Sequence, residues 1–182
     1  SWPSRRREVT PTALPRGPET GGRPDHAVVV TGLGTTNPLG GDVASTWAAL
    51  RASQCAVRRF DASPTLDPQL PVRLAAPLSV EPTPLLTPRE RRRLDRASQC
   101  ALLASREAWE RAGSPEVDSE RLAVSLSPGM GPVRSVMEAW DTAREHGPRR
   151  VPPTAIPALM PNAPAAAIGI ELGARGGVHS PV

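Results

Sequence analysis

The stretch that decides the fold is VVVTGLG at residues 28–34, followed by NPLG at residues 37–40. Three consecutive β-branched residues predict a strand that is covered on both faces. The glycine-punctuated loop leads to Asp42, a suitable N-cap for a helix with an apolar face. That face consists of Val43, Trp47 and Leu50. A strand, loop and helix in this order favour an α/β protein.

A longer helix is predicted to begin at Thr87. Thr87 and Glu90 have the spacing of a capping box, and Pro88 occupies the first helical position. Gly113 is the predicted end of this helix. Small apolar residues recur along it at three- and four-residue spacing: Leu94, Ala97, Ala101, Ala104 and Ala108. Such a narrow stripe permits close approach to another helix, so we interpret this segment as a buried layer helix.

The remaining elements continue the alternation of strands and helices. Residues 60–86 are irregular and rich in proline, with a short strand predicted at 72–76. Further elements are a strand at 122–126, a helix from Pro132 to Gly147, a helix at about 162–172 closed by Gly173, and a strand at 178–182. The middle helix has one apolar face, formed by Val133, Val136, Met137 and Trp140. The whole pattern predicts an α/β fold with helices between sheets.

Composition divides the chain into two parts. Residues 1–24 are rich in proline, arginine and glycine and have almost no apolar periodicity, so we expect a disordered leader. The folded domain is predicted to cover residues 25–182. The leader contains an arginine run at 5–7, but prolines replace the apolar region that an export signal needs.

The charge balance makes nucleic acid a partner to consider, because the net charge is +4 and the pI is about 10.7. All 22 basic residues are arginines, and they are spread along the chain, which argues against a nucleic-acid-binding module. No stretch approaches the roughly 18 apolar residues that span a bilayer. We therefore expect no nucleic acid and no membrane as partners, and a soluble, cytoplasmic chain.

Several motifs have plainer explanations than a catalytic site. Gly32-Leu33-Gly34 begins like a dinucleotide fingerprint, but Asn37 stands where the third glycine belongs. Neither Cys55 nor Cys100 has a histidine beside it in sequence or forms a CxxC motif, so we interpret Cys100 as a buried core thiol. The histidines have no metal-ligand spacing. We expect no metal and no cofactor.

One strongly cationic feature opens the predicted long helix. Its arginines are Arg89, Arg91, Arg92, Arg93 and Arg96, of which all but Arg91 share one side. Such a run is commonly a solvated helix face. It also makes a positive field that would raise the encounter rate of an acidic partner. The residues alone leave both interpretations open.

Taken in order, many segments resemble the amino-terminal half of the β-ketoacyl synthases, the thiolase-fold condensing enzymes of fatty acid and polyketide synthesis. The matching segments are 28–34, 37–40, Trp47, 59–63, 93–96, Ala101, 106–108, 147–151, 156–157, 160–162 and 172–177. The match runs from about residue 26 to the last residue. It is strongest to the discrete elongating synthases of actinobacteria, and implies the amino-terminal half of an αβαβα layered fold.

The resemblance implies three site features in this chain. Met130 matches a residue that gates the acyl pocket, and Thr154 and Ala155 match the segment that crosses the dimer interface and closes the partner's acyl tunnel. Arg89, Arg92 and Arg93 match the basic patch that docks an acidic acyl carrier protein, which favours the docking interpretation. The partners implied are that carrier protein and, in the full-length protein, a second copy.

The resemblance places the nucleophilic cysteine shortly after the segment that matches Gly176 to Val182, and both catalytic histidines in the other half. No catalytic residue is therefore expected in this chain, which should be inactive and unstable alone. The implied reaction of the family is decarboxylative condensation of an acyl chain with malonyl carrier protein. A chain-length-factor subunit, which lacks the cysteine, is the alternative that stays open.

Overall fold

The computed structural model describes residues 28–59 and 73–181; the predicted leader at 1–24 lies outside this part of the chain. In chain order the elements are α1 (Val43–Arg51), β1 (Arg58–Arg59), β2 (Leu74–Ala75), η1 (Thr83–Leu85), α2 (Pro88–Arg93), α3 (Arg96–Arg111), η2 (Ser119–Arg121), β3 (Val124–Ser125), α4 (Val133–His146), η3 (Pro148–Arg150), α5 (Ala155–Leu159), α6 (Ala163–Leu172) and β4 (Val178–His179). Among these residues no helix is long and apolar enough to cross a membrane.

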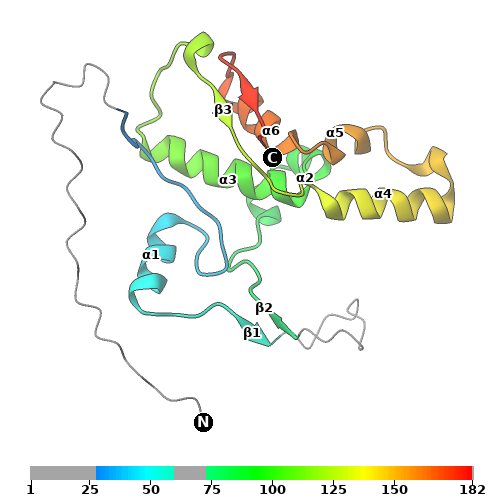
Figure 1. Ribbon diagram of the computed structural model, residues 1–182, viewed down its shortest axis with the longest axis horizontal. Helices are drawn as coiled ribbons and strands as arrows, with labels where there is room; N and C mark the ends of the chain where they lie inside the picture. Colours follow the sequence, from blue (N-terminus) through cyan, green and yellow to red (C-terminus); the bar gives the residue numbers. More distant parts are fainter. Residues whose placement is uncertain (1–27, 60–72, 182) are drawn as a thin grey trace, which may run out of the picture.

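Helix α3 crosses the middle of the molecule, with α6 and β3 on one side and α1 with the β1–β2 hairpin on the other (Figure 1). β1 pairs with β2 antiparallel, and β3 pairs with β4 parallel, Val124 opposite Val178. The predicted strands at 72–76, 122–126 and 178–182 are therefore present in shorter form. β1 was not predicted from the sequence, because a two-residue arginine strand has no alternating pattern.

The core lies where α6 packs on α3 and β3. Val124, Ala165 and Ile168 are its buried members, and Ala101, Leu126, Leu172 and Ala174 pack against them. Ala165 is fully buried, so its small side chain lets the two helices approach closely. Of the predicted alanine stripe on α3, Ala101 packs against this core, but the stripe is only half-buried and the buried residues of α3 are Ser98, Gln99 and Leu102.

The segment around residues 32–34 lies directly on the backbone of α3. A Cβ atom added to Gly34 would stand 1.8 Å from the carbonyl oxygen of Ala104, and one added to Gly32 would stand 2.0 Å from that of Ala108. No side chain fits at either position. The two glycines are thus explained by the closeness of the helix and not by a ligand.

The predicted strand at residues 28–30 is wrong for this structure, in which the segment is extended but unpaired. Val28, Val29 and Val30 are 99%, 70% and 79% exposed. A strand needs a neighbouring backbone to accept and donate its hydrogen bonds, and no described strand lies alongside. The β-branched composition identifies a segment that is suited to a strand, but strand pairing also requires a second backbone.

The loop before α1 is held by polar contacts. Asn37 Oδ1 accepts from the amides of Leu39 and Gly40 at 2.8 and 3.2 Å, and its Nδ2 donates to Thr46 at 2.9 Å. The predicted N-cap is confirmed, because Asp42 accepts from the amide of Ser45 and forms a capping box with it. These contacts set the entry to α1.

The predicted helix from Thr87 to Gly113 is two helices. The capping box of Thr87 and Glu90 is confirmed, but α2 ends at Arg93 and Leu94 is extended. Asp95 interrupts the helix because its carboxylate accepts from the amides of Ala97 and Ser98 at 2.9 and 3.1 Å. An aspartate that can cap a new helix competes with helix continuation, and here it starts α3.

The predicted helices at 132–147 and 162–172 are confirmed as α4 and α6, and Gly173 closes α6 in a left-handed conformation with a φ of 65°. The apolar face predicted for α4 is also present, but it is exposed. Met137 and Trp140 are 61% and 68% exposed. The periodicity identified the face of the helix without identifying what covers it.

Replacing Gly34 by alanine should destabilise the chain by about 2 kcal/mol or more, because the new methyl group collides with a backbone carbonyl that cannot move alone. Urea unfolding followed by circular dichroism measures the loss. Gly113→Ala is the control: Gly113 has a φ of +84° but open space around it, so that change should cost only about 1 kcal/mol. Equal losses for the two variants would contradict the packing argument.

Candidate functional site

Helix α2 carries an unpaired cationic face. Arg89, Arg92 and Arg93 are exposed, and none of the three has an ion pair within the described residues. Their positions along six residues of helix place them within one turn of each other. The face therefore presents three positive charges with no neutralising neighbour.

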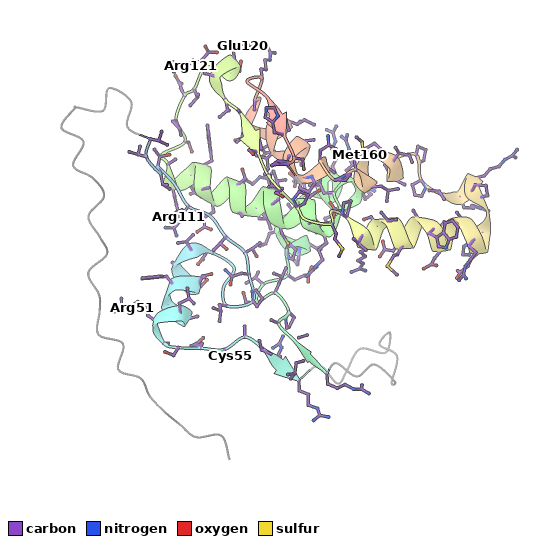
Figure 2. All side chains as sticks on the ribbon, viewed as in Figure 1. Arg51, Cys55, Arg111, Glu120, Arg121 and Met160 are labelled. Atoms are coloured by element: carbon purple, nitrogen blue, oxygen red, sulfur yellow. The ribbon has the colours of Figure 1, made fainter. Side chains whose placement is uncertain are left out.

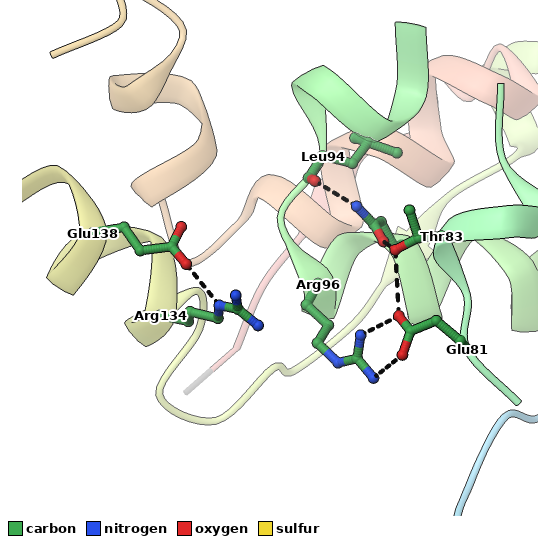
Figure 3. Close-up of polar contacts among 7 residues, drawn as sticks. Glu81, Thr83, Leu94, Arg96, Arg134 and Glu138 are labelled. Atoms are coloured by element: carbon green, nitrogen blue, oxygen red, sulfur yellow. Dashed lines mark hydrogen bonds and ion pairs between the residues drawn. The ribbon is translucent and has the colours of Figure 1, made fainter. Parts of the chain in front are cut away.

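Arg96 does not belong to this face, contrary to the prediction. The helix break places it in the first turn of α3, where its guanidinium binds both carboxylate oxygens of Glu81 (Figure 3). Beside this pair, Thr83 Oγ1 donates to Gln99 Oε1 at 3.2 Å and Gln99 Nε2 donates to the Leu94 carbonyl at 2.9 Å. Arg96 thus fastens the chain before α2 to α3.

A groove of about 430 Å³ lies between α2, α3, α5 and α6. Arg89, Arg93 and Thr154 line it together with Leu94, Leu102 and Ile170. Along α3 and α6 the lining is mostly apolar but includes Ser98 and Glu171, and α2 contributes Glu90 besides the two arginines. It brings two of the predicted docking arginines to the same place as one predicted pocket residue.

A second groove, of about 330 Å³, lies between α2, α4 and α5. Its lining includes Arg92, Arg93, Thr154 and Ala155. The beginning of α5 therefore separates the two grooves, with Thr154 in both. The structure brings the docking arginines and the segment at 154–155 together around α2.

Met130 is placed apart from these residues. It lies in the loop between β3 and α4 and is 84% exposed. Gly129 and Gly131 on either side have φ values of 66° and 70°, so the chain turns sharply at this point. Met130 lines neither groove, and its role as a gate stays a prediction.

An ion network ties α2 to the core. Arg106 on α3 donates from Nη2 to Glu90 Oε1 at 2.5 Å and from Nε to Glu171 Oε1 at 2.7 Å. Glu90 also accepts from the Thr87 amide at 2.7 Å through its other oxygen. The bond from Arg106 and then that from Thr87 lower the pKa of Glu90 from 4.5 to about 2. Glu171, and then Glu90, raise the pKa of Arg106 above its ordinary value.

The cysteines and histidines form no catalytic arrangement in this part of the chain. Cys55 is exposed in the segment after α1 (Figure 2), and Cys100 is half-buried on α3. Burial raises the pKa of the Cys100 thiol, which keeps it protonated and unreactive. In residues 28–59 and 73–181 no group of three or more potential ligands could hold a metal ion.

Comparison with known proteins identifies the family. Residues 25–182 match the family model described as "Beta-ketoacyl synthase, N-terminal domain". The chain belongs to the β-ketoacyl synthase family. It is 39% identical over 155 residues to the 3-oxoacyl-[acyl-carrier-protein] synthase 2 of Mycobacterium leprae (strain TN), covering 85% of this chain and 37% of that protein. The chain thus spans little more than a third of the length of such relatives.

Solved structures agree on the fold. A β-ketoacyl synthase from Burkholderia phymatum STM815 superposes with a TM-score of 0.66 at 26% identity, over 84% of this chain and 38% of that one. The ishigamide ketosynthase/chain length factor gives a TM-score of 0.71 at 24% identity, over 84% and 43% of the two chains, and supports the fold alone. The predicted fold class, an α/β chain with the amino-terminal half of the thiolase-like fold, is confirmed.

Sequence analysis of this β-ketoacyl synthase chain missed the network of Glu90, Arg106 and Glu171. Glu90 was assigned only to the capping box, and Arg106 only to a matching motif. The members come from three helices, so no spacing along the sequence brings them together. The one available signal was a cation in the interior of a helix with an apolar stripe, where a charge needs partners.

Glu90→Gln should weaken folding at neutral pH by roughly 2 kcal/mol, because it removes an ion pair whose side chains are only 35% and 20% exposed. The folded pKa lies below the unfolded one. The stabilisation is therefore complete above about pH 4.5 and is lost as the pH falls toward 2.

Unfolding free energies of the wild type and Glu90→Gln between pH 7 and pH 3 test this, and their difference should shrink on acidification. Glu110→Gln, an exposed change on α3, serves as control and should give little difference at any pH. A gap between wild type and Glu90→Gln that is the same at pH 7 and pH 3 would contradict the argument.

Proposed function

We propose that this chain is the amino-terminal part of a 3-oxoacyl-[acyl-carrier-protein] synthase of fatty acid or polyketide synthesis. In the proposed reaction CO₂ leaves the malonyl group, and the resulting carbon attacks the carbonyl carbon of an acyl chain held as a thioester on the enzyme; the C–S bond breaks and the enzyme's thiolate leaves. The new carbon–carbon bond lengthens the acyl chain by two carbons. The observation that carries the proposal is 39% identity to a protein of that name over 85% of the chain.

In this proposal α2 is the docking site of an acidic acyl carrier protein. The support is electrostatic: Arg89, Arg92 and Arg93 are exposed and unpaired on one short helix. Charges arranged in this way accelerate the encounter with an acidic surface and favour a defined orientation. Because the charges are exposed, salt should weaken the interaction strongly.

In this proposal the grooves beside α2 receive the acyl chain that the docked carrier protein delivers. Thr154 and Ala155 are proposed to line the acyl pocket, and their small side chains leave room at its end. Met130 is proposed as its gate, which requires the exposed loop at residues 128–131 to move. A homodimer of the full-length protein and a cytoplasmic location complete the proposal.

The resemblance places the family's catalytic cysteine and histidines outside the given 182 residues, so in this proposal those residues alone are inactive. The coding sequence after Val182 tests the assignment. An Ala-Cys motif within a few residues is expected for a condensing enzyme. A glutamine in place of that cysteine would instead indicate a chain-length-factor subunit.

The double variant Arg92→Glu/Arg93→Glu should weaken binding of purified holo acyl carrier protein by at least tenfold, because attraction at the docking helix becomes repulsion. Isothermal titration at 50 mM and 300 mM salt measures the effect. The wild type should lose affinity with salt, whereas the variant should depend on salt much less.

Arg149→Glu/Arg150→Glu is the matched control, since both arginines are exposed in η3 and the change in net charge is the same. It should leave the affinity within about twofold. Equal weakening by the two double variants would mean that overall charge and not α2 attracts the carrier, and the docking proposal would fall.

A further inference from the structure

Helix α2 has little packing of its own. It is six residues long and contains no buried residue. The chain on either side is anchored by Leu86, which is 3% exposed, and by the half-buried Leu94. Two anchored ends fix where the helix lies. They do not fix how it is turned about its own axis.

The bond between Glu90 and Arg106 supplies that missing constraint. Other polar contacts of α2 side chains in the described part of the chain stay local: Arg91 donates to the carbonyl oxygen of Leu86 at 2.8 Å, and Arg92 donates to that of Pro88 at 3.2 Å. Arg91 also donates to the carbonyl oxygen of Pro84 in η1 at 3.5 Å, so among these described side chains Glu90 alone bonds to α3. Arg106 is in turn held by Glu171 of α6, on the face where α3 and α6 form the core.

The geometry of the helix links Glu90 to the cationic face. Successive residues of an α-helix are rotated by about 100°, so Arg89, Arg92 and Arg93 occupy one sector beside Glu90. A rotation of α2 about its axis would turn all three guanidinium groups by the same angle. Holding Glu90 therefore holds the direction in which the three charges point.

We infer that Arg106 is a positioning residue for carrier docking, holding Glu90 against the core so that Arg89, Arg92 and Arg93 point in one fixed direction. The inference rests on the proposed function of α2. Arg106 itself touches no carrier. By holding the docking face in one orientation before the carrier binds, it lowers the entropy cost of binding.

The test compares four variants of the full-length protein for affinity to holo acyl carrier protein. Arg106→Ala should weaken binding about five- to tenfold, and Glu90→Gln should weaken it similarly while keeping its capping role. Arg106→Lys should recover part of the affinity, because an ammonium keeps the charge but not the two-pronged geometry. Arg111→Ala, which breaks the Arg111–Glu107 pair on the same helix, should leave affinity unchanged.

The double variant Arg106→Ala/Glu90→Gln separates positioning from general loss of stability. Its affinity should equal that of either single variant, because both changes break one connection. Hydrogen exchange should show faster exchange at residues 88–93 in Arg106→Ala and unchanged exchange in α4. Additive losses of affinity, or equal protection of residues 88–93 in wild type and Arg106→Ala, would overturn the inference.

The outcome also distinguishes this inference from the proposed function. If Arg92→Glu/Arg93→Glu weakens binding and Arg106→Ala does not, α2 docks the carrier without needing Arg106, and only the inference fails. If neither affects binding, the docking role of α2 fails with it.

Discussion

The close approach of backbone to backbone along α3 is the constraint on which the rest of the structure depends. Gly32 and Gly34 have no side chain and lie against the carbonyl oxygens of Ala108 and Ala104, while the fully buried Ala165 of α6 belongs to the core against which Ala101 of α3 packs. Once these contacts form, the neighbouring polar groups have little freedom left. Glu107, also on α3, accepts from the amides of Thr35 and Val43, each at 2.9 Å.

Charged side chains on α3 further restrain the segments that pack against this helix. Burial raises the pKa of Glu107, but the amides of Val43 and Thr35 and the guanidinium of Arg111 outweigh it and hold the pKa below its ordinary value. The residue directly before Glu107, Arg106, has the opposite role of joining two carboxylates. α3 therefore holds the loop before α1 through the carboxylate of Glu107. The same helix holds α2 through the guanidinium of Arg106.

Features decided by local chemistry could be predicted from the sequence. The capping boxes at Asp42 and Thr87 and the left-handed end at Gly173 depend on residues within one turn, so a short stretch contains the information. The cationic run with Arg89, Arg92 and Arg93 was identified for the same reason, whereas its docking role was implied only by the resemblance. Arg96 was misassigned because Asp95 could continue a helix or begin one, and only its bonds to the next amides decide between them.

Features that depend on a distant partner could not be predicted. The valines at 28–30 are suited to a strand, but strand formation requires a second backbone. Glu90, Arg106 and Glu171 lie far apart in sequence and meet only because α3 and α6 pack. The resemblance to a family suggested the residues of the proposed docking face, whereas the contacts of α2 with α3 are visible only in three dimensions.

The exposed Trp140 on α4 gives the chain a natural optical reporter. The indole is 68% exposed, so its fluorescence emission should lie toward the red, as it does for a ring in water. Trp109, half-buried on α3, should emit at shorter wavelength and change little when α4 is covered. Trp47 on α1 is 62% exposed as well, so a blue shift on adding a partner reports contact at the apolar face of α4 when the other tryptophans are replaced and Trp140 is kept.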